Sequence, residues 1–218
     1  MEVWVHLYGS NILDTQLPNG STVKLTQQTN YPWDGDIQFA MELVPDQAFA
    51  LRLRIPAWAR DAKVQVNGRS IDHTPRAGDY FEIARRWQKG DKVELTLPMP
   101  VQLIEAHPLV EAARNQVAVR RGPIVYCLES PDLPAGLNVS EVALAPNSIF
   151  NSRFDSQRLG GIVTLSVKAR RLPGGDWDGQ LYRELSKEPS KPTEIELIPY
   201  YAWGNRGPSE MTVWMPIR

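Results

Sequence analysis

Residues 49–55, Phe49-Ala50-Leu51-Arg52-Leu53-Arg54-Ile55, are the clearest indication of the fold in this chain. Large apolar side chains recur at every second position of this stretch, with alanine or arginine between them. Because successive side chains of a β-strand point to opposite faces, the alternation predicts a strand with one face on a core and one in water. This pattern is typical of antiparallel sheets, since the strands of parallel sheets tend to be apolar throughout.

The same period of two recurs along the whole chain. Further alternating segments lie at residues 64–66, 93–97, 163–167 and 195–197. Short turn strings such as Asn67-Gly68 and Gly160-Gly161 separate them. Residues 112–116 could hold one helical turn at most, and no longer stretch has helical periodicity. The sequence therefore predicts an all-β protein made of antiparallel β-sandwiches, without crossover helices.

Length and proline placement predict two such domains in tandem. The chain has 218 residues, enough for two domains of about 100 residues each. Leu97-Pro98-Met99-Pro100 ends a strand and hinders continuation of its ladder, and His107-Pro108 is extended. We expect one sandwich over residues 1–105 and a second over residues 106–218. Residues 171–193, rich in Gly, Pro, Asp and Lys, are expected to form a long loop.

Composition excludes several classes of protein. Lys and Arg number 24 against 25 Asp and Glu, and 42% of the residues are hydrophobic. This mix argues against disorder, and the charge balance offers no large attraction for nucleic acid. No apolar run reaches the roughly 18 residues that span a membrane. The N-terminus lacks the basic start and apolar core of a signal peptide, so a cytoplasmic location is expected.

Cys127 is the only cysteine in the sequence, which leaves no intrachain disulfide and no cysteine-rich zinc site. The three histidines, His6, His73 and His107, show no ligand spacing. A nucleophilic thiol needs exposure and a nearby cation or base. Cys127 lies instead in the apolar run Ile124-Val125-Tyr126-Cys127-Leu128, which predicts a buried strand and a structural role.

Seven tryptophans raise the question of carbohydrate binding, because an exposed indole can stack on a sugar ring whereas a buried one caps a core. Trp4 and Trp214 lie within strand patterns and are expected to pack in a core or an interface. Trp177 lies in the long loop and is the best candidate for an exposed contact. Trp203 is the second candidate for a carbohydrate contact.

Paired carboxylates could serve a glycosidase as acid and base. Glu194 and Glu196 alternate with apolar residues and are expected on the wet face of a strand. Asp34 and Asp36 flank a glycine and favour a turn. The remaining pair, Asp176 and Asp178, flanks Trp177. Residue chemistry thus yields no catalytic constellation, and we predict no catalytic, cofactor-binding or metal-binding residue in this chain.

Six local strings lie in order along nearly the whole chain: residues 28–35 (QTNYPWDG), 53–58 (LRIPAW), 97–100 (LPMP), 121–129 (RGPIVYCLE), 199–207 (PYYAWGNRG) and 211–216 (MTVWMP). Together they resemble the C-terminal portion of bacterial β-L-arabinofuranosidases of glycoside hydrolase family 127.

The resemblance implies a role without catalysis. Members of this family begin with an (α/α)6 catalytic barrel, which holds the cysteine nucleophile, the acid/base glutamate and a zinc site. The resemblance implies that this chain starts just after the barrel, with residues 3–8 as the first sandwich strand, so no catalytic residue and no zinc carries over. The expected function is an accessory β-sandwich region whose partner is the barrel, with a homodimer as a further expectation. The alternatives are a free-standing carbohydrate-binding module and a protein-interaction or dimerisation unit.

Overall fold

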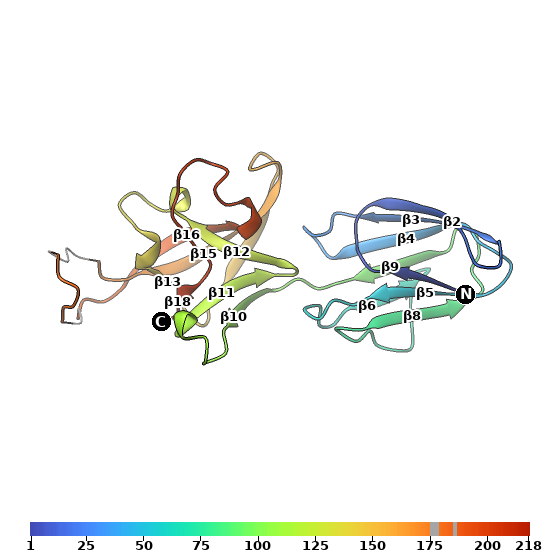
Figure 1. Cartoon of the computed structure of the whole chain (residues 1–218), viewed down its shortest axis with the longest axis horizontal. Coiled ribbons are helices and arrows are strands. Elements are labelled where there is room, and N and C mark those ends of the chain that lie inside the picture. The colour runs from blue at the N-terminus through green and yellow to red at the C-terminus, as the bar shows by residue number, and fades with distance from the viewer. Residues whose placement is uncertain (175–178, 185–186) are drawn as a thin grey trace. The chain divides into compact units, whose positions relative to one another are not determined.

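The computed structural model describes residues 1–174, 179–184 and 187–218. The chain divides into two compact units, Met1–Pro100 and Val101–Arg218, so the division lies earlier than the boundary expected near residue 105 (Figure 1). The reason is that β10 (Val101–Glu105) pairs along its whole length with β11 (Gln116–Arg121), which places β10 in the second unit.

The first unit is a sandwich of two sheets. One has the strand order β1-β5-β8 and the other the order β2-β3-β4-β9-β6-β7. The strands are β1 (Glu2–Val5), β2 (Asn11–Gln16), β3 (Thr22–Thr29), β4 (Asp36–Leu43), β5 (Phe49–Arg54), β6 (Lys63–Val66), β7 (Arg69–Ser70), β8 (Tyr80–Arg85) and β9 (Lys92–Thr96). The predicted strands at residues 49–55, 64–66 and 93–97 are thereby confirmed as β5, β6 and β9.

The alternating residues of the first unit form its core. Leu51 and Leu53 of β5 are fully buried, and Phe39 and Leu95 of the facing sheet are 1% exposed. Trp87 is also buried, and its indole N–H donates a hydrogen bond of 3.1 Å to the carbonyl oxygen of Phe49. The sandwich therefore closes over the apolar face that the period of two predicts.

One strand pair departs from the expected antiparallel arrangement. β1 runs parallel to β5, with Val3 opposite Leu51, while the other strand pairs described in the first unit are antiparallel. The first strand is also shorter than the expected residues 3–8, since β1 ends at Val5.

The second unit is built on a sheet with the order β10-β11-β12-β16-β15-β13, to which β14, β17 and β18 add pairings. Its strands beyond β10 and β11 are β12 (Ile124–Glu129), β13 (Val142–Ala143), β14 (Phe150–Asp155), β15 (Ile162–Arg171), β16 (Lys191–Pro199), β17 (Met211–Thr212) and β18 (Met215–Pro216). β12 lies inside the sheet, and five of its six residues are buried.

Helical structure is limited to short 3-10 turns in the described residues: η1 (Glu111–Ala113), η2 (Ser130–Asp132), η3 (Val139–Glu141) and η4 (Tyr200–Ala202). None of the helical segments among the described residues combines the length and the apolar character that spanning a bilayer requires. The loop expected over residues 171–193 is shorter than predicted, because Arg171 and Lys191 face each other as strand partners at the ends of β15 and β16.

Candidate functional site

Trp203, the second candidate for a carbohydrate contact, lies on the surface of the second unit. It follows the turn η4, which continues directly from β16. Its side chain is 41% exposed, and the two preceding aromatics, Tyr200 and Tyr201, are 45% and 62% exposed. Trp177, the first candidate, falls outside the described residues. The described part of the site is therefore one exposed aromatic turn, residues 200–203.

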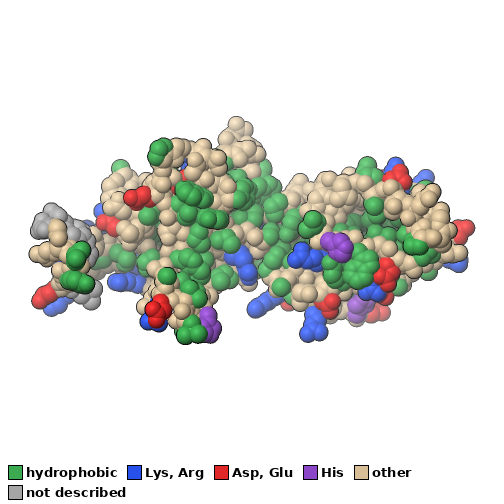
Figure 2. Space-filling model, viewed as in Figure 1, with side chains coloured by type: hydrophobic (Ala, Val, Ile, Leu, Met, Phe, Trp, Pro, Cys, Tyr) green, Lys and Arg blue, Asp and Glu red, His purple; other side chains and the backbone are tan. Residues whose placement is uncertain are grey.

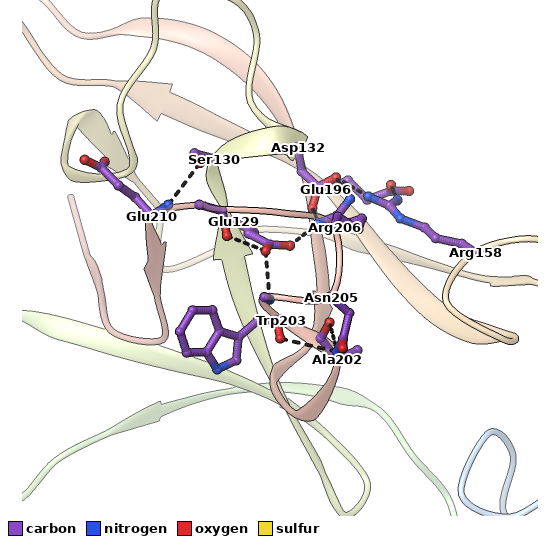
Figure 3. A network of polar contacts seen from close by, with 12 residues as sticks. Glu129, Ser130, Asp132, Arg158, Glu196, Ala202, Trp203, Asn205, Arg206 and Glu210 are labelled. Atoms are coloured by element: carbon purple, nitrogen blue, oxygen red, sulfur yellow. Dashed lines mark hydrogen bonds and ion pairs between the residues drawn. The ribbon is translucent and has the colours of Figure 1, made fainter.

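Hydrogen bonds to buried residues fix the backbone of this turn (Figure 3). The amide of Gly204 donates a hydrogen bond of 3.0 Å to Oε1 of Glu129, the last residue of β12. The side-chain amide of Asn205 donates one of 3.1 Å to the carbonyl oxygen of Ala202. Both hydrogen bonds restrain the backbone on either side of Trp203, so the exposed indole projects from a fixed segment.

Glu129 is part of a network of two arginines and three carboxylates (Figure 3). Arg206 binds Asp132 through both of its terminal nitrogens, at 2.7 and 2.6 Å, and forms a second ion pair with Glu129. Arg158 forms ion pairs with Asp132 and with Glu196 of β16. The network joins β12, η2, β16 and the segment after η4.

The network keeps the Glu129 carboxylate and the Arg206 guanidinium in their charged forms. Burial acts to raise the pKa of Glu129, but hydrogen bonds from Ser209, Arg206 and the Gly204 amide outweigh it and lower that pKa below its usual range. The hydrogen bond with Asp132, followed by that with Glu129, raises the pKa of Arg206. A carboxylate kept ionised by its partners is a poor proton donor, so this arrangement stabilises the fold and does not suit acid catalysis.

A second aromatic cluster lies on the first unit, around Trp4. Trp4 was expected to pack in a core or an interface; it lies outside the core of the first unit, since it is 44% exposed. The Cζ atom of Arg52 lies 4.8 Å from the centroid of the indole. The ring of Tyr80 meets the indole edge-on with centroids 4.8 Å apart, and His6 Nδ1 lies 2.5 Å from the Tyr80 hydroxyl. Hydrophobic side chains also lie on the surface of each unit in the view of Figure 2.

Cys127 is buried within β12, as predicted, and its exposure is 0%. Burial, reinforced by the carboxylates of Glu129 and Asp132, raises the pKa of its thiol to about 12. The thiolate is the nucleophilic form, so this thiol is inert at neutral pH.

The acidic pairs also have structural positions where they are described. The Asp36 amide donates a hydrogen bond of 3.2 Å to Asp34 Oδ1, which confirms a turn. Glu194 is exposed on β16, whereas Glu196 belongs to the ion-pair network. Asp176 and Asp178 lie outside the described residues. Within the described ranges, no group of three His, Cys, Asp or Glu side chains is placed to hold a metal ion.

Sequence reasoning missed the ion-pair network around Glu129, and for Trp4 it did not decide between a core and an interface. Glu129 and Arg206 are distant along the chain, and neither stands in a motif that indicates its partner. The alternation of β1 does set Trp4 on the face opposite to Val3, and that signal could have raised the question of what covers it.

Comparison with protein families places each unit in one family domain. Residues 2–99 match the description "Beta-L-arabinofuranosidase, GH127 middle domain". Residues 101–216 match the description "Glycoside hydrolase family 127 C-terminal domain". The two matches meet where the structure divides.

Relatives agree over the same region. A non-reducing end β-L-arabinofuranosidase from Bifidobacterium longum subsp. longum is 32% identical over 215 residues, covering 91% of this chain and 31% of its own length. A solved GH127 β-L-arabinofuranosidase from Geobacillus stearothermophilus T6 is 40% identical with a TM-score of 0.91, over 100% of this chain and 34% of its own. A solved structure described as a glycoside hydrolase is 43% identical with a TM-score of 0.93, and the match covers 98% of this chain and 35% of that protein. The chain thus spans about a third of the length of the relatives it matches.

Proposed function

The chain belongs to glycoside hydrolase family 127, and on that premise we propose that it is the non-catalytic β-sandwich region of a β-L-arabinofuranosidase-like enzyme. Its role is to support a catalytic barrel supplied by the rest of that enzyme. The observation that carries the proposal is the correspondence of the two units with the middle and C-terminal domains of the family.

The state of Cys127 supports a role without catalysis. Hydrolysis through a thiolate needs an ionised, accessible sulfur and a proton donor on the other side of the glycosidic bond. The thiol of Cys127 is buried and its pKa is raised to about 12. The two carboxylates that act on this thiol, Glu129 and Asp132, form ion pairs with Arg206. On this proposal the nucleophile, the acid/base residue and the zinc site belong to the barrel, and a homodimer is a further proposed assembly.

A second candidate function is glycan binding at the exposed aromatic turn, residues 200–203. It is supported by three exposed aromatics on a turn fixed to Glu129. Titration of the chain with arabinose-containing oligosaccharides, followed by calorimetry, tests it. Saturable binding that is lost in Trp203→Ala and kept in Lys92→Ala would favour this candidate, and no heat of binding would reject it.

Activity measurements test the main proposal. We expect no turnover of an aryl β-L-arabinofuranoside by the purified 218-residue chain during a long incubation. A family relative such as the enzyme from Geobacillus stearothermophilus T6 serves as the positive control. Turnover that tracks the purified chain and disappears in Cys127→Ala would overturn the accessory role. Sequencing the DNA upstream tests the other half of the proposal, which requires an in-frame barrel domain.

A further inference from the structure

The two outward faces of the first unit differ in chemistry. One sheet presents mostly polar side chains to the outside, although Ile12 and Leu43 are also exposed on it, and one row of polar side chains crosses four strands through paired positions. The members of that row are Gln28, Gln38, Glu94 and Gln65. Such a face is typical of a sheet surface that stays in contact with water.

The opposite face, on β1, β5 and β8, carries an exposed tryptophan at the centre of a built cluster. Trp4, Arg52 and Glu82 are paired across the three strands. Arg52 forms ion pairs with Glu82 and with Glu2, the latter with Nε 3.1 Å from the carboxylate. We call the outward residues Glu2, Trp4, His6, Arg52, Tyr80 and Glu82 the Trp4 face.

Contacts within the Trp4 face hold the indole in one position. Its N–H donates a hydrogen bond of 2.8 Å to Glu2, Arg52 lies over its ring, and Tyr80 meets its edge. A side chain already fixed in this way loses little conformational entropy when a partner covers it. Trp, Tyr and Arg are also the residues that contribute most to binding at protein interfaces. A sugar is a poorer occupant, because Arg52 already lies over the ring on which a sugar would stack.

We propose that the Trp4 face is the docking surface for the domain that precedes the middle domain in this family. This inference rests on the proposed function and names the surface that meets the partner. The middle-domain match begins at residue 2, in β1, and the relatives extend over about twice as much chain outside the match. A preceding domain would therefore join the chain at β1, the strand that carries Trp4. Because the two domains would be joined directly at this strand, the preceding domain would be present at a high effective concentration near the Trp4 face.

A thiol reporter beside the Trp4 face tests the inference. Ala84 of β8 is exposed and lies opposite Ala50, which in turn lies opposite Glu2. Ala84→Cys therefore places a thiol next to the face without removing any member of it. Thr96→Cys on the polar face is the matched control, since Thr96 is also exposed. Each variant is made in the isolated chain and in the full-length gene product, and labelling is followed peptide by peptide by mass spectrometry.

We expect the Ala84→Cys thiol to react about tenfold or more slowly in the full-length protein than in the isolated chain, because labelling then requires opening of a docked surface. The Thr96→Cys thiol should react at the same rate in both. Adding Trp4→Ala to the reporter in the full-length protein should restore much of the faster rate. Hydroxyl-radical oxidation of Trp4 in the unsubstituted proteins gives the same comparison without a reporter.

Equal Ala84→Cys rates in the two proteins, together with equal oxidation of Trp4, would overturn the inference and leave the proposed function standing. If only the Thr96→Cys thiol is labelled more slowly in the full-length protein, docking is assigned to the polar face, and the inference is overturned as well. A gene product with no preceding domain would overturn both the inference and the proposed function, so the two failures are distinguishable.

Discussion

Gly35 lies directly against Leu97. The Leu97 amide donates a hydrogen bond of 2.8 Å to the Gly35 carbonyl oxygen, and the Leu97 carbonyl oxygen occupies the space that a Cβ atom at position 35 would need. The two residues belong to two of the strings that carry the family resemblance, residues 28–35 and 97–100. Those strings are thus the two halves of one tight contact at the end of the first sandwich.

This contact predicts that Gly35→Ala destabilises the first unit. The added methyl group would overlap a backbone oxygen, and relief requires a shift of the backbone, at about 1–3 kcal/mol or more. Gly9→Ala is the control, because a Cβ at position 9 meets nothing within 4 Å. Urea denaturation measures the difference in the free energy of unfolding. Equal values for the two variants would contradict the prediction.

Removal of the Glu129 charge is expected to destabilise the second unit. Glu129→Gln leaves Arg206 with one fewer ionised partner in a buried setting, and loss of one partner of a buried pair typically costs about 3 kcal/mol. The matched control is Glu194→Gln, at an exposed position of β16, where the change should stay within about 0.5 kcal/mol. Chemical denaturation of both variants provides the measurement, and an effect at Glu194 as large as at Glu129 would count against the network.

The same carboxylate predicts a dependence of stability on pH. The pKa of Glu129 is lower in the folded protein than in the unfolded chain, because its hydrogen bonds from Ser209, Arg206 and Gly204 outweigh its burial. Falling pH therefore protonates the unfolded chain first. The stability that Glu129 contributes is complete above its unfolded pKa of about 4.3 and is lost as pH falls through the folded value.

The free energies of unfolding of the unsubstituted chain and of Glu129→Gln, measured from pH 7 down to pH 3, test this dependence. The gap between the two proteins should be constant at neutral pH and should narrow below the unfolded pKa. A gap that stays the same throughout would show that the carboxylate does not titrate with folding.

Burial of Cys127 predicts slow chemistry in the native state. A thiol reagent should label it slowly at neutral pH and promptly after denaturation, since its pKa is raised to about 12 and its side chain is inaccessible. Cys127→Ser should lower stability by roughly 1–3 kcal/mol, because a hydroxyl would be buried without an arranged partner. Mass spectrometry of the labelled chain checks the first part and urea denaturation the second. Rapid native labelling would place the sulfur at the surface.

Strand positions and the burial of Cys127 follow from the sequence by itself. The alternation at residues 49–55 became β5, and the alternation at residues 93–97 became β9. The apolar run around Cys127 likewise became the interior strand β12. These features are local, because the alternation of apolar and polar residues shows which face of an extended segment is apolar. The family strings are equally a property of the sequence, and they led to the same family as the comparisons.

Only the tertiary structure decided which distant residues meet and which faces stay open. Alternation placed Trp4 opposite to Val3 but did not state whether anything covers that side of the sheet, and the indole is in fact 44% exposed. The parallel pairing of β1 with β5 and the ion pair of Glu129 with Arg206 are likewise long-range. The physical reason is that strand pairing and ion pairing depend on how segments far apart in sequence are brought together. The periodicity of side chains within one segment does not indicate which other segment it contacts.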